Sequence, residues 1–211
     1  MNIPSRPTRR TRAKHGGQKP SIESRLLSAT ERLLEKGNTF AALTIEELSK
    51  EAGISRGTFY LHFKNKGELV TRLLDHFTEE LSVNLGTWTS NADAAERKDV
   101  SDAVRSMVET FRKHKAIIVA VRDTMPHDKD VEEIYFGMIK KVSEMAKKST
   151  GTIKKRGKSR TRTTDDVADA LAVVIALYST YMIDKQDDKS IKNTSRALGY
   201  ICESAIFSDD S

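Results

Sequence analysis

From residue 21 onward, apolar residues recur with the period of an α-helix along almost the whole chain. The first stripe predicts a helix that ends at Gly37, because glycine tolerates the left-handed backbone of a helix stop. Thr44 with Glu47 forms the capping box expected at the start of a second, short helix, which Gly53 closes. Ser55 is predicted to cap a third short helix, and a long fourth helix follows. The first and fourth stripes consist of Ile22, Leu26, Ala29 and Leu33, and of Leu69, Leu73, Phe77, Leu81 and Trp88.

The second half of the chain keeps this helical period and contains no segment with the alternation of a strand. Residues 116–121 are apolar on every side, which predicts a helix buried all round, and Pro126 is expected to end it. Residues 149–165, rich in Ser, Thr, Lys and Arg, are predicted to form a loop. The sequence therefore predicts an all-α fold of about nine helices, of which about five lie in this half. Their stripes cover residues 100–111, 116–121, 131–145, 166–184 and 190–207.

The net charge of +6 is concentrated at the N-terminus. Residues 1–20 contain six basic and no acidic residues, and residues 21–211 carry equal numbers of each sign. This basic arm is predicted to be disordered until it binds a polyanion, and nucleic acid is favoured over membrane because the arm has no apolar face. The single cysteine excludes a disulfide within the chain, and no apolar run reaches the roughly 18 residues of a membrane span, so we expect a cytosolic protein.

The second and third predicted helices have the arrangement of a helix-turn-helix, since a Gly-Ile-Ser turn joins them and another helix precedes them. The inward positions are apolar, whereas the outward positions near the start of the third helix suit a helix that enters the major groove of DNA. From the residues alone, the alternative is a helical hairpin whose Tyr60 and His62 merely cover the core. The outward residues are Arg56, Gly57, Thr58, Tyr60, Leu61 and His62.

The run from Thr44 to Leu69, TIEELSKEAGISRGTFYLHFKNKGEL, resembles the DNA-binding signature of the TetR (tetracycline repressor) family at nearly every fixed position. With the first helix, the resemblance extends to residues 21–75. The rest of the chain resembles the family in its number of helices, and the run from Phe111 to Lys115 is weakly similar to regulators of the ethionamide-regulator type. The resemblance implies a bacterial homodimeric repressor that a small effector releases from a palindromic DNA operator.

Carried over residue by residue, the resemblance also implies which side chains contact DNA. The planar guanidinium of Arg56 can donate hydrogen bonds to O6 and N7 of one guanine together. A helix N-terminus such as that at Thr44 favours a phosphate. The alternative for His62 is an ordinary surface histidine. The resemblance places Thr44, Tyr60, His62 and Lys66 on phosphates, and Arg56, Gly57 and Thr58, with Leu61, nearest the bases.

We expect a basic arm at 1–20, a helix-turn-helix domain at 21–68 and a helical regulatory and dimerisation domain at 69–208. In the mechanism that the resemblance implies, the effector shifts the fourth helix and spreads the two recognition helices. The helices at 166–184 and 190–207 carry more apolar surface than one monomer core needs, which predicts a four-helix bundle between two copies. The alternative is a large monomer core. The residues behind this prediction are Leu171, Val174, Ile175, Tyr178, Leu198, Ile201 and Ala205.

A neutral, lipophilic effector is expected, because the inward stripes of the regulatory domain supply aromatic and methionine side chains and few charged ones. The hydroxyl of Tyr135 or Tyr178 is expected to hydrogen-bond this effector. The alternative is that these side chains are plain core. The candidate ligand-binding residues are Trp88, Met107, Phe111, Val121, Met125, Tyr135, Met138 and Tyr178.

Other chemistries fit less well. Gly151 and Gly157 resemble a phosphate-binding loop, but five residues separate them where that motif requires four. The five histidines never fall at metal-ligand spacing and no acidic pair accompanies a nucleophile, so we expect no metal, no cofactor and no enzymatic activity. The rival hypothesis is a non-specific architectural DNA-binding protein, motivated by the arm and by the basic residues of 149–165. Such a protein would lack a repressor's preference of about 10³ or more for one sequence.

Overall fold

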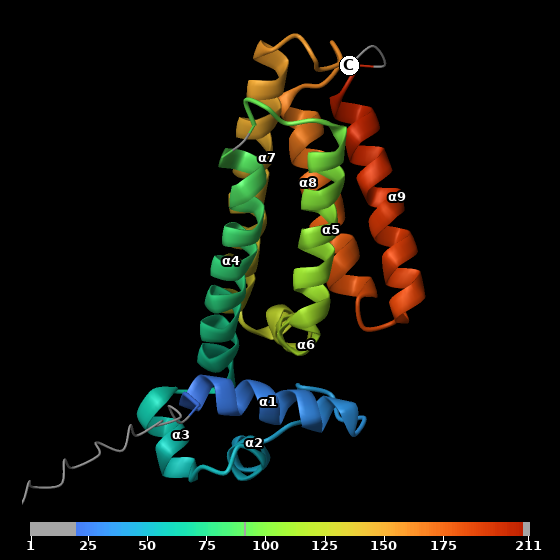
Figure 1. Cartoon of the computed structure of the whole chain (residues 1–211). Helices are drawn as coiled ribbons and strands as arrows, with labels where there is room; N and C mark the ends of the chain where they lie inside the picture. Colours follow the sequence, from blue (N-terminus) through green and yellow to red (C-terminus); the bar gives the residue numbers. More distant parts are fainter. Residues whose placement is uncertain (1–19, 91, 209–211) are drawn as a thin grey trace, which may run out of the picture.

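The computed structural model describes residues 20–90 and 92–208, and these residues form an elongated helical molecule (Figure 1). Three short helices form a small unit at one end, and a long helix rises from this unit into a larger bundle. The all-α prediction is confirmed, since the described residues contain nine α-helices and no strand beyond one isolated bridge between Ser159 and Phe207. The helices are α1 (Ile22–Glu35), α2 (Ile45–Glu51), α3 (Arg56–His62), α4 (Lys66–Ser90), α5 (Arg97–Lys113), α6 (Lys115–Thr124), the 3-10 turn η1 (Met125–His127), α7 (Lys129–Lys155), α8 (Asp165–Met182) and α9 (Asp188–Ile206).

The helix starts lie where the capping residues predict them. Thr44 accepts a hydrogen bond from the backbone N–H of Glu47, whose carboxylate accepts one from the Thr44 N–H, so the predicted capping box is present. The Ser55 hydroxyl accepts from the N–H of Thr58 at the start of α3. Each cap satisfies backbone donors that the first turn of a helix leaves without partners.

The helix over residues 116–121 is buried on nearly every side, as predicted. Among these six residues of α6, only Val119 is half-buried, and the other five are buried. The predicted stripe of α5 is likewise buried, and its Phe111 meets Phe77 of α4 edge-on at 5.0 Å between ring centroids. These contacts belong to one hydrophobic core that runs continuously from Leu26 in the small unit to Phe207 at the far end.

The predicted loop at 149–165 is wrong in its first half, because α7 continues to Lys155. Ser149, Thr150 and Ile153 are buried on its inner face, so small polar residues continue the apolar stripe. Only residues 156–164 connect α7 to α8, and this short connection is tied down. Arg156 donates to two carbonyls of the segment before α5, and the Thr163 hydroxyl donates to the Ala205 carbonyl of α9.

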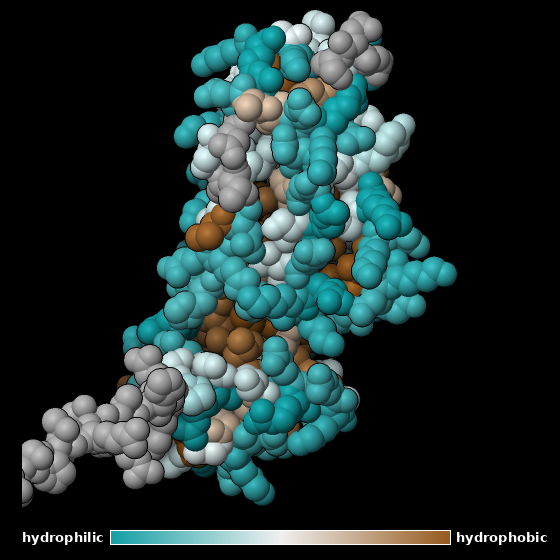
Figure 2. All heavy atoms as spheres, viewed as in Figure 1, coloured by the Kyte–Doolittle hydropathy of each residue, from teal (hydrophilic) through white to brown (hydrophobic). Residues whose placement is uncertain are grey.

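Two close approaches join the small unit to the bundle. The Asp123 carboxylate of α6 accepts a hydrogen bond of 3.1 Å from the backbone N–H of Phe40, in the loop after α1. At the start of α4, a side chain on Gly67 would collide with the carboxylate of Asp128, the residue that caps α7. Figure 2 shows a largely hydrophilic face on which hydrophobic side chains gather where the two parts meet. The small unit is therefore held against α6 and α4, and the start of α4 lies close to the start of α7.

No helix among residues 20–90 and 92–208 is both long enough and apolar enough to cross a membrane.

Candidate nucleic-acid interface and ligand cavity

The turn between α2 and α3 has the tight geometry of a helix-turn-helix. Gly53 has φ of +65°, a left-handed conformation that glycine adopts without the steric strain that other residues meet there. The Arg25 guanidinium of α1 donates to the carbonyls of Ala52 and Gly53, which fixes the turn against the first helix. The side chain of Arg32 anchors the end of α2 through the carboxylate of Glu51. The sequence pattern gives Arg25 no role, because only the folded arrangement brings α1 and this turn together.

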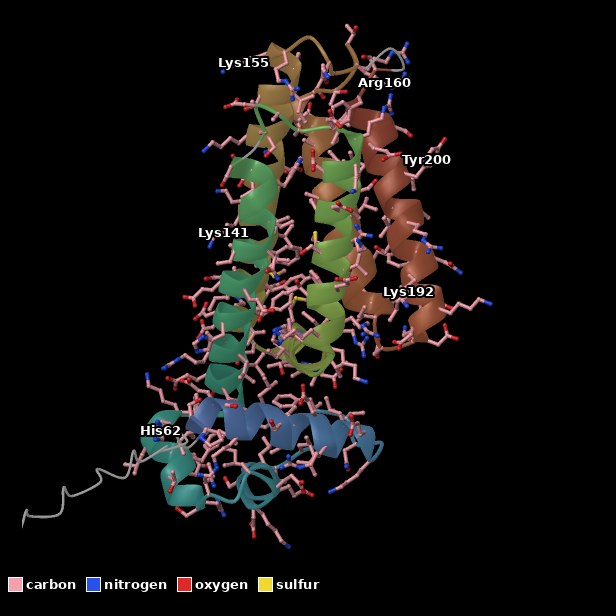
Figure 3. The ribbon with its side chains drawn as sticks, in the orientation of Figure 1. His62, Lys141, Lys155, Arg160, Lys192 and Tyr200 are labelled. Carbon is pink, nitrogen blue, oxygen red and sulfur yellow. The ribbon has the colours of Figure 1, made fainter. Side chains whose placement is uncertain are left out.

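The short helix α3 separates its core side chains from its outward ones. Phe59 and Phe63 at the next turn are buried, with ring centroids 5.3 Å apart. By contrast, Leu61 is 85% exposed and Tyr60 is 50% exposed. Figure 3 shows His62 on α3, at the end of the molecule opposite to the C-terminus of α9. An almost fully exposed leucine on a rigidly held helix indicates a surface that contacts a partner rather than one that covers the core.

The structure distinguishes the base-facing candidates from one another. Arg56 is exposed and lies 3.8 Å from the Glu46 carboxylate, a loose pair that leaves the guanidinium able to turn outward. Gly57 is also exposed, and a Cβ there would make only an ordinary contact with Ser55, so the fold itself does not require glycine. Thr58 is half-buried, and its hydroxyl lies 2.9 Å from the Ser55 Oγ. Its methyl group is therefore the part best suited to a base contact.

Of the phosphate-facing candidates, Thr44, Tyr60 and His62 are exposed, but the ammonium group of Lys66 points into the protein. Its Nζ donates to the carbonyl oxygens of Phe40, Ala41 and Leu43 at 3.1, 2.9 and 2.6 Å. Burial is the main cause that lowers the pKa of this ammonium, although Glu47 nearby opposes the effect. All three N–H donors of Lys66 are already used, so in this structure the side chain holds the loop between α1 and α2, and its expected phosphate contact stays a prediction.

An apolar cavity of about 50 Å³ lies between α4, α5, α7, α8 and α9, in the half of the bundle distant from α3. Two of the residues that line it, Trp88 and Thr150, each carry a buried polar atom, Nε1 and Oγ1, that has no hydrogen-bond partner among the described residues. Burial raises the pKa of the lining thiol Cys202 to about 12, so this side chain stays neutral. The cavity therefore has apolar walls, and two of its lining residues carry hydrogen-bonding groups that no protein group uses.

Two of the eight predicted ligand residues, Trp88 and Met107, line this cavity. The others lie elsewhere, and neither tyrosine offers a free hydroxyl. Tyr135 is fully buried with its hydroxyl 2.8 Å from Thr180, and the Tyr178 hydroxyl accepts from the Gln186 amide. The cavity is thus displaced toward the far end of α7, where the sequence pattern predicts a loop. Phe111, Val121, Tyr135 and Met138 are buried in the core, whereas Met125 and Tyr178 are half-buried.

Residues 26–73 match the family model described as bacterial regulatory proteins, tetR family. The chain is 30% identical over 127 residues to the HTH-type transcriptional regulator EthR of Mycobacterium tuberculosis, an alignment that covers 58% of each chain. It is 27% identical over 120 residues to the uncharacterized HTH-type transcriptional regulator YerO of Bacillus subtilis, which covers 54% of this chain and 40% of that protein. The chain therefore spans 58% of the length of EthR and 40% of the length of YerO.

Solved structures share the whole fold. The ketosteroid transcriptional regulator KstR2 of Mycobacterium tuberculosis superposes with a TM-score of 0.67 at 19% identity, over 92% of this chain and 98% of that one. NalD, the secondary repressor of the MexAB-OprM multidrug efflux pump in Pseudomonas aeruginosa, gives 0.65 at 17% identity, over 89% and 98%. At these identities the likeness concerns the fold, and it confirms the N-terminal helix-turn-helix followed by a helical domain.

The three carbonyl contacts of Lys66 give a prediction for stability. Replacing Lys66 with Met removes a donor from each of these carbonyls, of which that of Phe40 keeps the N–H of Leu43, and we expect the free energy of unfolding to fall by about 1–3 kcal/mol. The matched variant Lys64→Met changes an exposed lysine of the same connection and should stay within about 0.5 kcal/mol. Urea unfolding of both variants measures the difference. An unchanged stability for Lys66→Met, together with a weaker salt dependence of DNA binding, would return this lysine to the phosphates.

Proposed function

With an N-terminal domain of the tetR family as the premise, we propose that the whole chain is a dimeric, effector-responsive transcriptional repressor. The observation that carries this proposal is the exposed face of α3. This helix buries Phe59 and leaves Tyr60, Leu61 and His62 in solvent, at a position rigidly set by α1 and α2. A non-specific architectural protein is less favoured, because such a protein does not need a fixed helix with exposed polar and apolar groups side by side.

We propose that α3 enters the major groove of duplex DNA. Arg56 takes a guanine edge, while the Thr58 methyl and Leu61 contact thymine methyl groups. Thr44 at the start of α2, with Tyr60 and His62, contacts phosphates and sets the register of the helix. The basic arm at 1–20 lies outside the described residues except for Pro20, and we propose that it follows phosphates with little reading of sequence.

Dimerisation through α8 and α9 is supported by their outward faces. Val174 and Tyr181 of α8 and Tyr200 and Ile201 of α9 are between 45% and 67% exposed. Figure 3 shows Tyr200 pointing away from the bundle. Val174 and Tyr181 lie two helical turns apart, as two side chains on one face of a helix-bundle interface do. Of the residues behind the predicted four-helix bundle, Val174 and Ile201 are exposed, Ile175 and Leu198 are buried within one protomer, and Leu171, Tyr178 and Ala205 are half-buried.

We propose that the effector enters the cavity beside Trp88 and Thr150. A drug-sized ligand needs roughly 300–1,000 Å³, so the cavity of about 50 Å³ has to expand when the ligand enters. One of its walls is α4, which also begins at the DNA-binding domain. A ligand that favours the expanded state by about 1–3 kcal/mol would weaken operator binding roughly 5-fold to 150-fold. The effector is a neutral, lipophilic molecule with an acceptor for the Trp88 N–H.

Variants of α3 separate phosphate contacts from base contacts. Tyr60→Ala and His62→Ala should weaken binding to all sequences alike, and each should lower the slope of log affinity against log salt by about 0.9 if one phosphate is no longer bound. Arg56→Ala should instead cost about 1–3 kcal/mol on sequences with the preferred guanine and little on others. Sequencing a competing duplex library before and after binding measures both effects. Identical preferences in wild type and Arg56→Ala would contradict the assignment of Arg56.

The dimer interface is tested by placing a charge within it. We expect the wild type to sediment as a dimer at micromolar concentration and the double variant Tyr200→Glu/Ile201→Glu as a folded monomer, because two buried carboxylates would lack partners. Lys141→Glu, on the opposite side of the molecule (Figure 3), is the control and should remain dimeric. Analytical ultracentrifugation gives the masses. A monomeric wild type, or a dimer that withstands the double variant, would refute this interface.

The cavity gives a paired prediction. Thr150→Val removes the unused hydroxyl at nearly constant volume and should leave the melting temperature unchanged or raised, whereas Trp88→Phe removes the unused N–H together with part of the ring and should lower the melting temperature slightly by enlarging the cavity. In thermal-shift titrations, Trp88→Phe should bind lipophilic ligands that bear a carbonyl about tenfold more weakly, the equivalent of about 1.4 kcal/mol. Matched hydrocarbon ligands should bind both proteins alike. A set of stabilising ligands that are mostly charged would contradict the proposed site.

A further inference from the structure

The outward face of α7 carries a stripe of paired lysines that the proposed function does not use. The pairs are Lys140 with Lys141, Lys147 with Lys148, and Lys154 with Lys155, and each follows the previous one by seven residues. Seven residues are almost two helical turns, so the pairs fall on one face about 10.5 Å apart. This lysine stripe therefore extends about 21 Å along the helix.

Most of these ammonium groups are exposed to solvent and make no ion pair. Five of the six lysines are exposed, and only Lys147 is half-buried, with its Nζ 3.2 Å from Glu144 and 3.4 Å from Asp169. Within residues 20–90 and 92–208, the other five make no ion pair. Between the first and last pair, Glu144 is exposed and the apolar Met145 is half-buried, so no exposed apolar side chain interrupts the stripe. A shallow depression, lined by Gly137, Lys140, Lys141, Glu144, Met145 and Lys148, lies at the end of the stripe nearer α3.

The stripe lies in a segment, residues 140–162, whose net positive charge exceeds that of the whole chain. Residues 140–162 contain ten basic residues and one acidic residue, a net charge of +9 in a chain whose net charge is +6. The rest of the chain is therefore net negative, even with its basic arm included. Not all ten basic groups are free, because Arg156 donates to the carbonyls of Ala92 and Ala95 in the connection between α4 and α5. The exposed part of this charge consists of five lysines of the stripe and Arg162.

The stripe lies apart from both proposed interfaces. In Figure 3, Lys141 and Lys155 point to one side of the molecule, whereas Tyr200 and Lys192 of α9 point to the other, so a dimer through α8 and α9 leaves the stripe open. Lys155 also lies at the opposite end of the molecule from His62 of α3. A duplex seated on α3 does not reach the stripe without bending, and DNA is stiff over about 150 base pairs.

We propose that the lysine stripe of α7 binds the phosphate backbone of a second duplex DNA segment, without reading its sequence. Lysine supplies compact, mobile point charges suited to phosphates rather than the planar fork that reads a base edge. A stripe of about 21 Å faces roughly six phosphates of one strand, which are spaced about 3.4 Å apart along the axis. A membrane surface or an acidic protein is a poorer match, because membrane insertion and protein interfaces need several exposed apolar anchors, and Phe136, one turn before Lys140, is the one large apolar side chain of α7 that is exposed.

The test compares the full-length wild type with a variant that replaces Lys140, Lys141, Lys148, Lys154 and Lys155 with Gln. Its matched control replaces five exposed lysines elsewhere, Lys98, Lys115, Lys129, Lys185 and Lys192, with Gln. On a labelled duplex of arbitrary sequence, the stripe variant should bind at least tenfold more weakly at about 50 mM salt, with a slope against log salt reduced by about 0.9 for each phosphate no longer bound. The control should stay within about twofold of wild type. Replacing the same five stripe lysines with Arg should preserve binding.

A second measurement isolates the stripe from α3. Protein saturated on an immobilised duplex should capture a second, labelled duplex, and the stripe variant should lose this capture while keeping the first duplex. The double variant Tyr60→Ala/His62→Ala should bind the operator more weakly yet keep the capture that depends on the stripe, so failure of the operator proposal and failure of this one are distinguishable. Equal binding and capture by the stripe variant and its control, with unchanged melting temperatures, would overturn the proposal. If the stripe variant lost binding to phosphatidylserine vesicles but kept its binding to duplex DNA, this result would overturn the proposal in favour of a membrane surface.

Discussion

The continuity of α4 is the constraint on which the other features of this protein depend. Its first residue, Lys66, is fixed beneath three carbonyls of the loop between α1 and α2, and Trp88 in its last turns forms a wall of the cavity. A helix of 25 residues is about 37 Å long and transmits displacement along its axis because every turn is hydrogen-bonded to the next. In the proposed mechanism, a change in cavity volume at one end moves the base of the DNA-binding domain at the other.

The remaining contacts between the DNA-binding domain and the helical bundle also couple these two parts. Asp123 of α6 holds the Phe40 N–H, and the Asp128 cap of α7 lies so close to Gly67 that any larger residue would push it away. Both helices also pack on α4, so the domain cannot turn against one of them without affecting the others. Packed interiors change between discrete arrangements rather than deforming smoothly. This favours a two-state response in which the ligand shifts the population toward the arrangement with the larger cavity.

The features that could be predicted from the sequence are those that depend on local signals. The caps at Thr44 and Ser55 and the glycine turn at Gly53 are set by a few neighbouring residues, so the pattern of residues alone was enough to predict the helix-turn-helix. Features that depend on distant partners could not be predicted in this way. Thr150 resembles a loop residue because its polarity is recognisable as part of a buried face only once α8 and α9 close the cavity beside α7.

The same limit applies to the candidate ligand residues and to Lys66. Tyr135 has the chemistry of a ligand contact, but Thr180, 45 residues later, already takes its hydroxyl. Lys66 lies at a helix N-terminus, where a phosphate contact is reasonable, yet the loop that follows α1 folds back over its ammonium group. Hydrogen-bond partners brought together by tertiary packing leave no periodic trace in the sequence.

Coupling between the cavity and the DNA-binding domain is tested most directly by footprinting the wild-type dimer on the DNA upstream of its own gene, with and without a neutral lipophilic ligand that stabilises the protein. We expect protection of an inverted repeat whose half-sites face the two α3 helices about 34–36 Å apart, and loss of that protection when the ligand is added. Uniform protection with no preferred site would contradict this coupling. So would a site whose protection does not change when a ligand that binds the cavity is added.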